Sequence, residues 1–217
     1  DVDNDDQGAN NGRLYGEYKV GDSDFSSGQQ TLFSSNYIYV AGRGANNIGM
    51  QSGGWTISWQ GEMENKTEGT SVLDAIKLAV DPNVSVQFSE DGKNVEGDIA
   101  VVVIGEEPYA EMEGDRDDLK LNKKDLDVIK RLKNKNIPVV VVLFSGRPMI
   151  ITDEIDQWDS LVAAWLPGTE GQGISDVLFG DYNPTGKLSF SWPKSINQFP
   201  ITKSDSYLFD FGYGLSY

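Results

Sequence analysis

The sequence predicts an α/β three-layer sandwich, in which a mainly parallel sheet is covered by helices on both faces. Two segments carry this prediction, because residues 99–104 and Val139–Phe144 are apolar at every position. Side chains alternate between the two faces of a strand, so such segments are buried on both faces, as in a parallel sheet. An amphipathic helix at residues 122–134 separates them, and a strand–helix–strand order implies a parallel crossover.

The elements before this unit are shorter. A strand is expected at residues 37–41, where an apolar run is stopped by Gly42. Residues 42–61 are rich in turn-forming residues, with no helix expected there. A Thr-Ser pair followed by an acidic residue can cap a helix over about residues 70–80. Residues 84–88 then alternate between apolar and polar side chains, which predicts a half-buried strand.

The elements after this unit repeat its pattern. Residues 161–165 are expected to form another buried strand, and residues 171–179 another helix, ended by Gly180. Residues 188–193 alternate and stop at a proline, which indicates an edge strand or an extended arm. We therefore expect one sandwich domain at residues 37–217, preceded at 1–36 by an irregular acidic segment that is poorly ordered or loosely attached.

Composition excludes several kinds of chemistry. The chain has 217 residues, with 18 Lys and Arg against 34 Asp and Glu, so its formal charge is −16, and it contains no Cys and no His. Thiolate nucleophiles, imidazole acid/base catalysis and Ser-His-Asp triads are therefore excluded. The acidic balance without a basic cluster predicts no binding to nucleic acid, and no apolar run approaches the roughly 20 residues of a membrane span. Carboxylates, Lys, Tyr or hydroxyls must supply any chemistry.

The acidic loop at residues 105–118 is the main candidate for a site. It follows the central strand, and ligands bind at the carboxyl ends of the strands in such sheets. Four Glu and three Asp lie within its fourteen residues. A carboxylic acid can act as a general acid at neutral pH when apolar surroundings or neighbouring negative charge raise its pKa, and this loop meets the second condition. A solvated loop and a cation site remain alternatives, and the pattern does not choose among the carboxylates.

Two tryptophans follow a Gly-Gly pair in residues 51–60. We expect Trp55, directly beside Gly53 and Gly54, to be exposed and able to stack on a sugar or another flat apolar face. For Trp59 we expect a place in the hydrophobic core. The alternative is that both tryptophans fill the hydrophobic core.

Cofactor and metal motifs match only in part. Residues 40–47 resemble a dinucleotide-binding turn, but Asn47 stands at the third glycine position and no acidic residue follows a second strand at the expected distance. Residues 3–8 begin like a calcium loop, but Leu14 replaces the bidentate Glu. We therefore expect no cofactor and no metal, with a flavodoxin-like nucleotide-binding domain as a remaining alternative.

Several motifs together resemble the second domain of glycoside hydrolase family 3, an (α/β)6 sandwich that accompanies a TIM-like barrel in β-glucosidases and exo-β-glucanases. The resemblance runs from about Tyr37 to Tyr217. The motifs are Val40-Ala41-Gly42, Gln51-Ser52-Gly53-Gly54-Trp55-Thr56-Ile57, Gly105-Glu106-Glu107-Pro108-Tyr109-Ala110-Glu111, Gly114-Asp115, Ser145-Gly146-Arg147-Pro148, residues 163–173, Gly180-Asp181-Tyr182, Thr185-Gly186-Lys187-Leu188 and Phe211-Gly212-Tyr213-Gly214-Leu215.

The resemblance implies a retaining hydrolase of terminal β-D-glucosyl bonds in a β-glucan or β-glucoside. It implies that Glu111 is the general acid/base, that Trp55 is the aromatic sugar clamp and that Tyr109, in the same motif as Glu111, contacts substrate. The nucleophile would lie on a barrel domain that these residues do not include, so the chain is expected to be inactive without that partner. A carbohydrate-binding module without turnover is the alternative function, and a secreted or periplasmic setting is expected.

Overall fold

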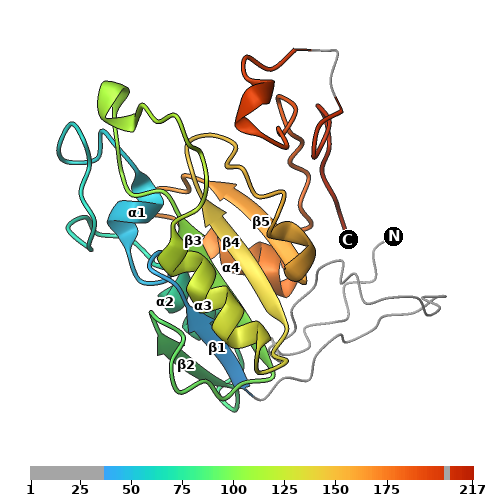
Figure 1. The fold of residues 1–217 in the computed structure, drawn as a ribbon. Helices are drawn as coiled ribbons and strands as arrows, with labels where there is room; N and C mark the ends of the chain where they lie inside the picture. The colour runs from blue at the N-terminus through green and yellow to red at the C-terminus, as the bar shows by residue number, and fades with distance from the viewer. Residues whose placement is uncertain (1–36, 203–205) are drawn as a thin grey trace, which may run out of the picture.

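A five-stranded parallel sheet forms the centre of the chain in the computed structural model, which describes residues 37–202 and 206–217 (Figure 1). The strands lie in the order β2-β1-β3-β4-β5, and every neighbouring pair is parallel. Their bounds are β1 Tyr37–Ala41, β2 Ser85–Ser89, β3 Ile99–Gly105, β4 Val139–Phe144 and β5 Ser160–Trp165. The acidic lead and its calcium-like loop lie outside the described residues.

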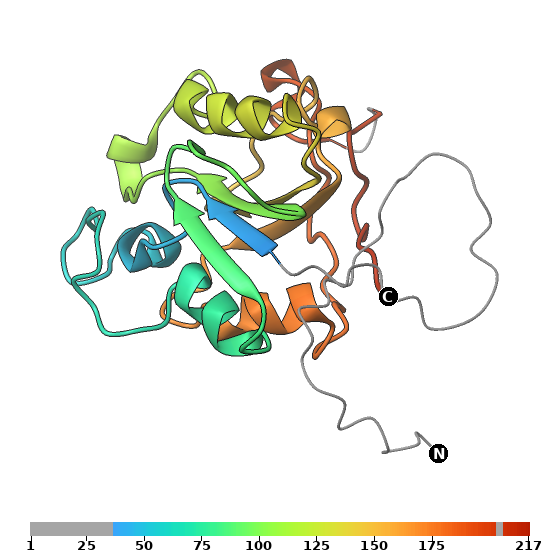
Figure 2. The same ribbon diagram turned by 90° about the horizontal axis from the view of Figure 1, so that it is seen from below.

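Helices cover both faces of this sheet. Figure 2 shows α3 on one side and α2 with α4 on the other. The helices are α1 Ile48–Ser52, α2 Val72–Ala79, α3 Lys123–Lys133 and α4 Gln172–Phe179, with short 3-10 turns η1 Glu111–Gly114, η2 Ile155–Gln157 and η3 Ile196–Gln198. The three-layer α/β sandwich is therefore confirmed.

Two hydrophobic cores lie on opposite faces of the sheet. Val101 and Val103 of β3 pack with Leu73 of α2 in one core, whereas Val102 packs with Leu132 of α3 in the other. Every residue of β3 and β4 is buried, which is why neither strand shows a polar face in the sequence. Alternation along each strand thus supplies both layers of helices with apolar surface.

Local capping explains where the helices begin, and it corrects one expectation. Ser71 accepts a hydrogen bond from the amide of Asp74, and Asn122 accepts one from Lys124, so both predicted helix starts are confirmed. The turn-rich interpretation of residues 42–61 was wrong at α1. Asn47 caps this short helix by accepting from the amide of Met50.

The segment at residues 188–193 is an extended arm outside the sheet. Trp192 of this segment forms an isolated antiparallel bridge with Phe209. Its indole N–H donates to the carbonyl of Met149 at 2.8 Å, and its side chain is buried against the face that α3 covers. Within the part of the chain described, no helix is long and apolar enough to cross a membrane.

Candidate active site

Loops from the carboxyl ends of β1, β3 and β4 meet at one edge of the sheet, where ligands bind in open parallel sheets. Figure 1 shows the loop after β3, which carries η1, at the same end as the segment that follows α1. We call residues 105–118 the acidic loop and residues 53–61 the tryptophan loop. The two loops contact each other directly, because Gln60 accepts a hydrogen bond from the amide of Ala110 at 2.8 Å.

Glu106 anchors the base of the acidic loop. Its side chain is only 4% exposed, and its carboxylate accepts from Arg147 Nη2 at 2.7 Å and from Arg147 Nε at 3.1 Å. Arg116 Nη1 lies 3.4 Å away, and the Tyr109 hydroxyl donates at 3.2 Å. Because its oxygens are occupied by these donors, this carboxylate fixes the loop and is not available to a substrate.

A second ion pair joins the loop after β1 to the start of α3. Arg43 donates from Nε and Nη2 to the two carboxylate oxygens of Asp125 at 2.9 and 3.1 Å. Asp125 is 1% exposed. Arg43 also donates to the carbonyl of Gly105 at 3.2 Å and pairs with Glu107. The hydrogen bond to Asp125 raises the pKa of Arg43. Arg43 thus joins the loop after β1 to the end of β3 and to the start of α3.

Tyr109 is half-buried between these anchors. The Arg147 guanidinium lies 4.6 Å from the centre of its ring. A Cβ at Gly114 would lie 2.2 Å from this ring, so the ring in this place requires glycine there, and one at Gly146 would lie 2.9 Å from its hydroxyl. Burial, and next the negative charge of Glu106, raise the pKa of Tyr109 to about 12. The hydroxyl therefore keeps its proton at neutral pH and is not a nucleophile there.

This pKa gives a stability prediction at alkaline pH. The folded chain holds the Tyr109 proton up to about pH 12, whereas an unfolded tyrosine releases it near 10.0. The folded state thus binds more protons between these values, so its free energy of unfolding should fall as pH rises through them. Urea unfolding from about pH 8 to 12 measures this. Tyr109→Phe should reduce the fall, exposed Tyr182→Phe should not, and an equal effect of both would contradict the assignment.

Glu111 stands at the rim of the acidic loop, where η1 begins. Its side chain is exposed, and its carboxylate Oε2 accepts a hydrogen bond from the indole N–H of Trp59. Its backbone φ is +46°, a conformation that costs energy for a residue other than glycine. The expectation that Trp59 fills the core was wrong, since its side chain is 45% exposed. The reason is that the tryptophan loop packs on the acidic loop and not on the sheet.

Trp55 is exposed, as expected, with 70% of its surface accessible. Its ring centre lies 6.4 Å from that of Trp59. Gly54 permits the close approach of the two loops, because a Cβ there would lie 2.1 Å from the carbonyl oxygen of Tyr109. The structure therefore brings Trp55 next to the loop that carries Tyr109 and Glu111, although more than fifty positions separate Trp55 from that pair.

Comparison with known proteins assigns this arrangement to a family. The model of the glycosyl hydrolase family 3 C-terminal domain matches residues 32–217. The chain belongs to this family. A periplasmic β-glucosidase from Salmonella typhimurium is 36% identical over 186 residues, which is 70% of this chain and 24% of that protein. A xylan 1,4-β-xylosidase from Xylanibacter ruminicola is 39% identical over 137 residues, 56% of this chain and 16% of that protein.

A solved structure shares the fold of the family 3 domain. An exo-1,3/1,4-β-glucanase from a Pseudoalteromonas species superposes with a TM-score of 0.77 at 45% identity, over 83% of this chain and 25% of that one. The chain thus spans about a quarter of the length of the β-glucosidase and of the glucanase.

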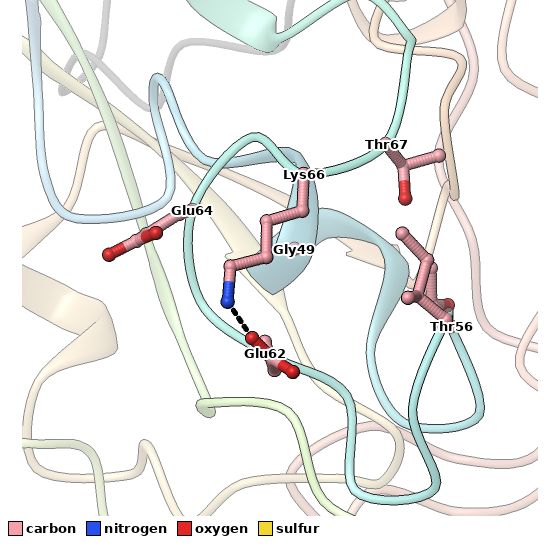
Figure 3. Close-up of a pocket in the computed structure, with 7 residues that line it drawn as sticks. Gly49, Thr56, Glu62, Glu64, Lys66 and Thr67 are labelled. Carbon is pink, nitrogen blue, oxygen red and sulfur yellow. Dashed lines mark hydrogen bonds and ion pairs between the residues drawn. The ribbon is translucent and has the colours of Figure 1, made fainter.

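Two hollows border the loops of the family 3 domain. An open groove of about 470 Å³ lies beside Tyr109 and is lined on its other sides by Arg43, Glu107, Arg116 and Lys120, among others. Figure 3 shows the smaller one, next to the tryptophan loop, where Lys66 points to Glu62. Its volume of about 10 Å³ has room for at most one water. Of these two hollows, the groove is the one large enough to admit part of a sugar, and its lining includes Tyr109 and Glu113 but neither Trp55 nor Glu111.

In the turn that resembles a dinucleotide fingerprint, two backbone amides donate hydrogen bonds to carbonyls of the domain itself. The amide of Gly44 donates to the carbonyl of Val103 at 3.1 Å, and that of Ala45 donates to Gly42 at 3.2 Å. A phosphate-binding turn needs such amides free. This geometry opposes the nucleotide-binding alternative. Within residues 37–202 and 206–217, no group of three or more His, Cys, Asp or Glu side chains is placed to hold a metal ion.

Sequence reasoning missed the residues that fix the loops of the family 3 domain. Arg147 lies 41 positions from the Glu106 that it binds, and Arg43 lies 82 positions from Asp125. The one available signal was placement, since Arg43 and Arg147 each follow a predicted strand and so had to lie at the same edge as the acidic loop.

Proposed function

We propose that this domain supplies the general acid/base, Glu111, of a retaining β-glucosidase or exo-β-glucanase that hydrolyses terminal β-D-glucosyl bonds. The observation that carries the proposal is the contrast between two carboxylates of one loop. Glu106 is buried and occupied by two arginines, whereas Glu111 is exposed at the rim beside an exposed aromatic side chain. An acid/base must reach the glycosidic oxygen, and the exposure of Glu111 supports this role better than the buried, occupied carboxylate of Glu106 does.

In the proposed reaction the proton moves twice. Protonated Glu111 donates to the leaving oxygen while the nucleophile attacks the anomeric carbon, which breaks the glycosidic bond and forms a glycosyl ester. The Glu111 carboxylate then takes a proton from water, which attacks the same carbon and releases the nucleophile. Retaining enzymes need two carboxylates about 5–5.5 Å apart. We assign the second to a barrel domain, in accordance with the family resemblance.

Two aromatic side chains are proposed to bind the sugar. Trp55 offers an exposed ring face on which a pyranose can stack beyond the scissile bond. Tyr109 lines the groove, and we propose that it contacts the substrate there. Its hydrogen bond to Glu106 also keeps the acidic loop in place.

The domain is proposed to work only against a barrel domain, whether joined to it or supplied separately. We call the two together the assembled enzyme. The test is nitrophenol release from an aryl β-glucoside by the purified chain, alone and mixed with a family 3 barrel domain. We expect release in the mixture only. Turnover by the chain alone, retained after repurification, would contradict the assignment of the nucleophile to the barrel.

The same mixture tests the second candidate, a carbohydrate-binding module. The exposed ring of Trp55 is the observation that favours it. Affinity of the chain for a β-glucan, lost in Trp55→Ala and kept in Glu111→Ala, together with no turnover in the mixture, would support binding without catalysis.

We also propose a secreted or periplasmic setting. A relative that is 36% identical is a periplasmic β-glucosidase. The absence of cysteine is compatible with an oxidising compartment.

A further inference from the structure

We infer that the ring of Tyr109 supports the turn that carries Glu111, and that Arg147 holds this ring in place. Tyr109 and Arg147 are then positioning residues for the acid/base. The inference rests on the proposed role of Glu111 and adds Arg147 and Gly114 to it. It also gives Tyr109 a second task besides the proposed contact with substrate.

The turn η1 has few attachments of its own. Its N-cap residue, Ala110, makes no side-chain capping bond, and the amide of Asp115 donates back to the carbonyl of Met112 at 3.1 Å. Among the hydrogen bonds of the described residues, none joins the backbone of residues 111–114 to another segment. Packing therefore decides where the backbone of η1 lies.

Gly114, the last residue of η1, makes this packing contact. It is buried, and a Cβ there would lie 2.2 Å from Cδ2 and 2.6 Å from Cε2 of Tyr109. Its φ is outside the left-handed region, so the ring and not the backbone conformation requires glycine here. Residues 110–113 thus span two residues that touch each other, and Glu111 lies on this span. Because packed groups transmit displacement, a shift of the ring moves the span and its carboxylate.

Arg147 fixes the ring through two kinds of contact. Its Nε and Nη2 donate to Oε1 of Glu106 at 3.1 and 2.7 Å, and its guanidinium carbon lies 4.6 Å from the centre of the Tyr109 ring. The Tyr109 hydroxyl donates to the other oxygen of the same carboxylate, Oε2, at 3.2 Å. Guanidinium, carboxylate and phenol are therefore joined pairwise, and none can turn without breaking a contact with the other two.

The ionic character of this set favours a positioning role over a purely stabilising one. Glu106 is 4% exposed and Arg147 is 25% exposed. A buried ion pair adds little net stability compared with apolar side chains of similar volume, because both charges lose their hydration. Its directed hydrogen bonds do fix orientation. An acid/base needs orientation, since a misplacement of about 1 Å can cost on the order of 10²-fold in rate.

The first experiment tests the contact in the chain itself, by a double-mutant cycle in urea. Gly114→Ala should lower the urea midpoint of unfolding, because the added methyl group meets the ring. In a Tyr109→Ala background the ring is absent, so Gly114→Ala should lower the midpoint much less. Gly186→Ala is the control, since a Cβ there meets nothing within 4 Å, and its effect should be the same in both backgrounds. An equal loss for Gly114→Ala in both backgrounds would overturn the contact.

The second experiment measures kcat/KM of the assembled enzyme for aryl β-glucosides ordered by leaving-group pKa. Gly114→Ala and Arg147→Lys should each lower kcat/KM about 10- to 100-fold for poor leaving groups and change it little for a dinitrophenyl glucoside, which needs no acid. Arg147→Lys keeps a cation beside Glu106, so the fold is retained while the forked donor is lost. Gly186→Ala should leave the whole series unchanged. The thermal unfolding midpoint checks that each variant is folded.

Two variants of Tyr109 separate support of the turn from contact with substrate. Tyr109→Phe keeps the ring against Gly114, whereas Tyr109→Ala removes it. Only Tyr109→Ala should therefore add a loss that grows as the leaving group becomes poorer. If Tyr109→Ala slows good and poor leaving groups equally, Tyr109 is a substrate contact alone and the inference is overturned.

The outcomes also separate this inference from the proposed function. If Glu111→Gln shows the leaving-group dependence and neither Gly114→Ala nor Arg147→Lys does, the positioning role is wrong and the acid/base role stands. If Glu111→Gln shows no such dependence, the acid/base role is wrong and the positioning role is overturned with it.

Discussion

Replacing Glu111 with glutamine in the assembled enzyme should lower kcat/KM for glucosides with poor leaving groups by about 10²–10⁴-fold. Glutamine keeps the size of the side chain and can accept from the Trp59 indole, but it has no proton to donate. A dinitrophenyl group leaves as a stable anion and needs no proton, so kcat/KM for its glucoside should change little. The measurement is a series of aryl β-glucosides ordered by leaving-group pKa.

Glu113→Gln is the matched control for this prediction. Glu113 is exposed on the same turn, two residues away, and η1 contains both. Because Glu113 lines the groove, we expect Glu113→Gln to change kcat/KM equally for good and poor leaving groups, with no added loss for the poor ones. Equal slowing of good and poor leaving groups by Glu111→Gln would argue against an acid role, and so would a similar series for the two variants.

Arg43→Met should destabilise the fold strongly, with a loss of about 3–5 kcal/mol in the free energy of unfolding. It leaves the carboxylate of Asp125, which is 1% exposed, without its bidentate partner. A buried charge without a partner carries most of its desolvation cost. Urea unfolding at neutral pH, read by far-UV circular dichroism, gives the value.

Two further variants show whether the buried pair is the cause. Lys123→Met removes an ion pair with Asp127 on the exposed side of α3, where the lysine side chain is 88% exposed, and it should have little effect. Arg43→Met with Asp125→Leu removes both charges and should recover much of the loss. Similar losses for Arg43→Met and Lys123→Met, or no recovery in the double variant, would contradict this account.

The layers of the fold could be predicted because each central strand is one segment that is apolar at every position, which indicates burial on both faces of the sheet. Residues 99–104 have no polar position, so β3 had to be central, and Asn122 marked the start of α3 by local capping alone. Residues 188–193 show where this reasoning ends. Their alternation fits a strand, but Trp192 is held by a hydrogen bond to Met149 from another loop, which no local pattern reveals.

The candidate site could be located from the sequence but not assembled from it. The topology put the acidic loop at the carboxyl edge, yet seven carboxylates looked alike until Arg147 and Arg116 were seen to occupy Glu106. The expectation that Trp59 lies in the core was wrong for the same reason. An aromatic residue four positions after Trp55 predicts core packing by composition, and only its contact with a loop some fifty residues away makes it a partner of Glu111. For Glu106 and for Trp59 alike, the environment of the side chain depends on contacts between segments that are distant in the sequence.

The most direct test of Glu111 as the acid/base is chemical rescue by azide. In Glu111→Ala of the assembled enzyme, a dinitrophenyl glucoside should still form the glycosyl ester, but water lacks the base that activates it. Azide needs no base, so it should attack the anomeric carbon, displace the carboxylate nucleophile and yield β-glucosyl azide with a faster turnover. Azide should give neither effect in Glu113→Ala. No azide product in Glu111→Ala, or the same product and acceleration in Glu113→Ala, would contradict the assignment.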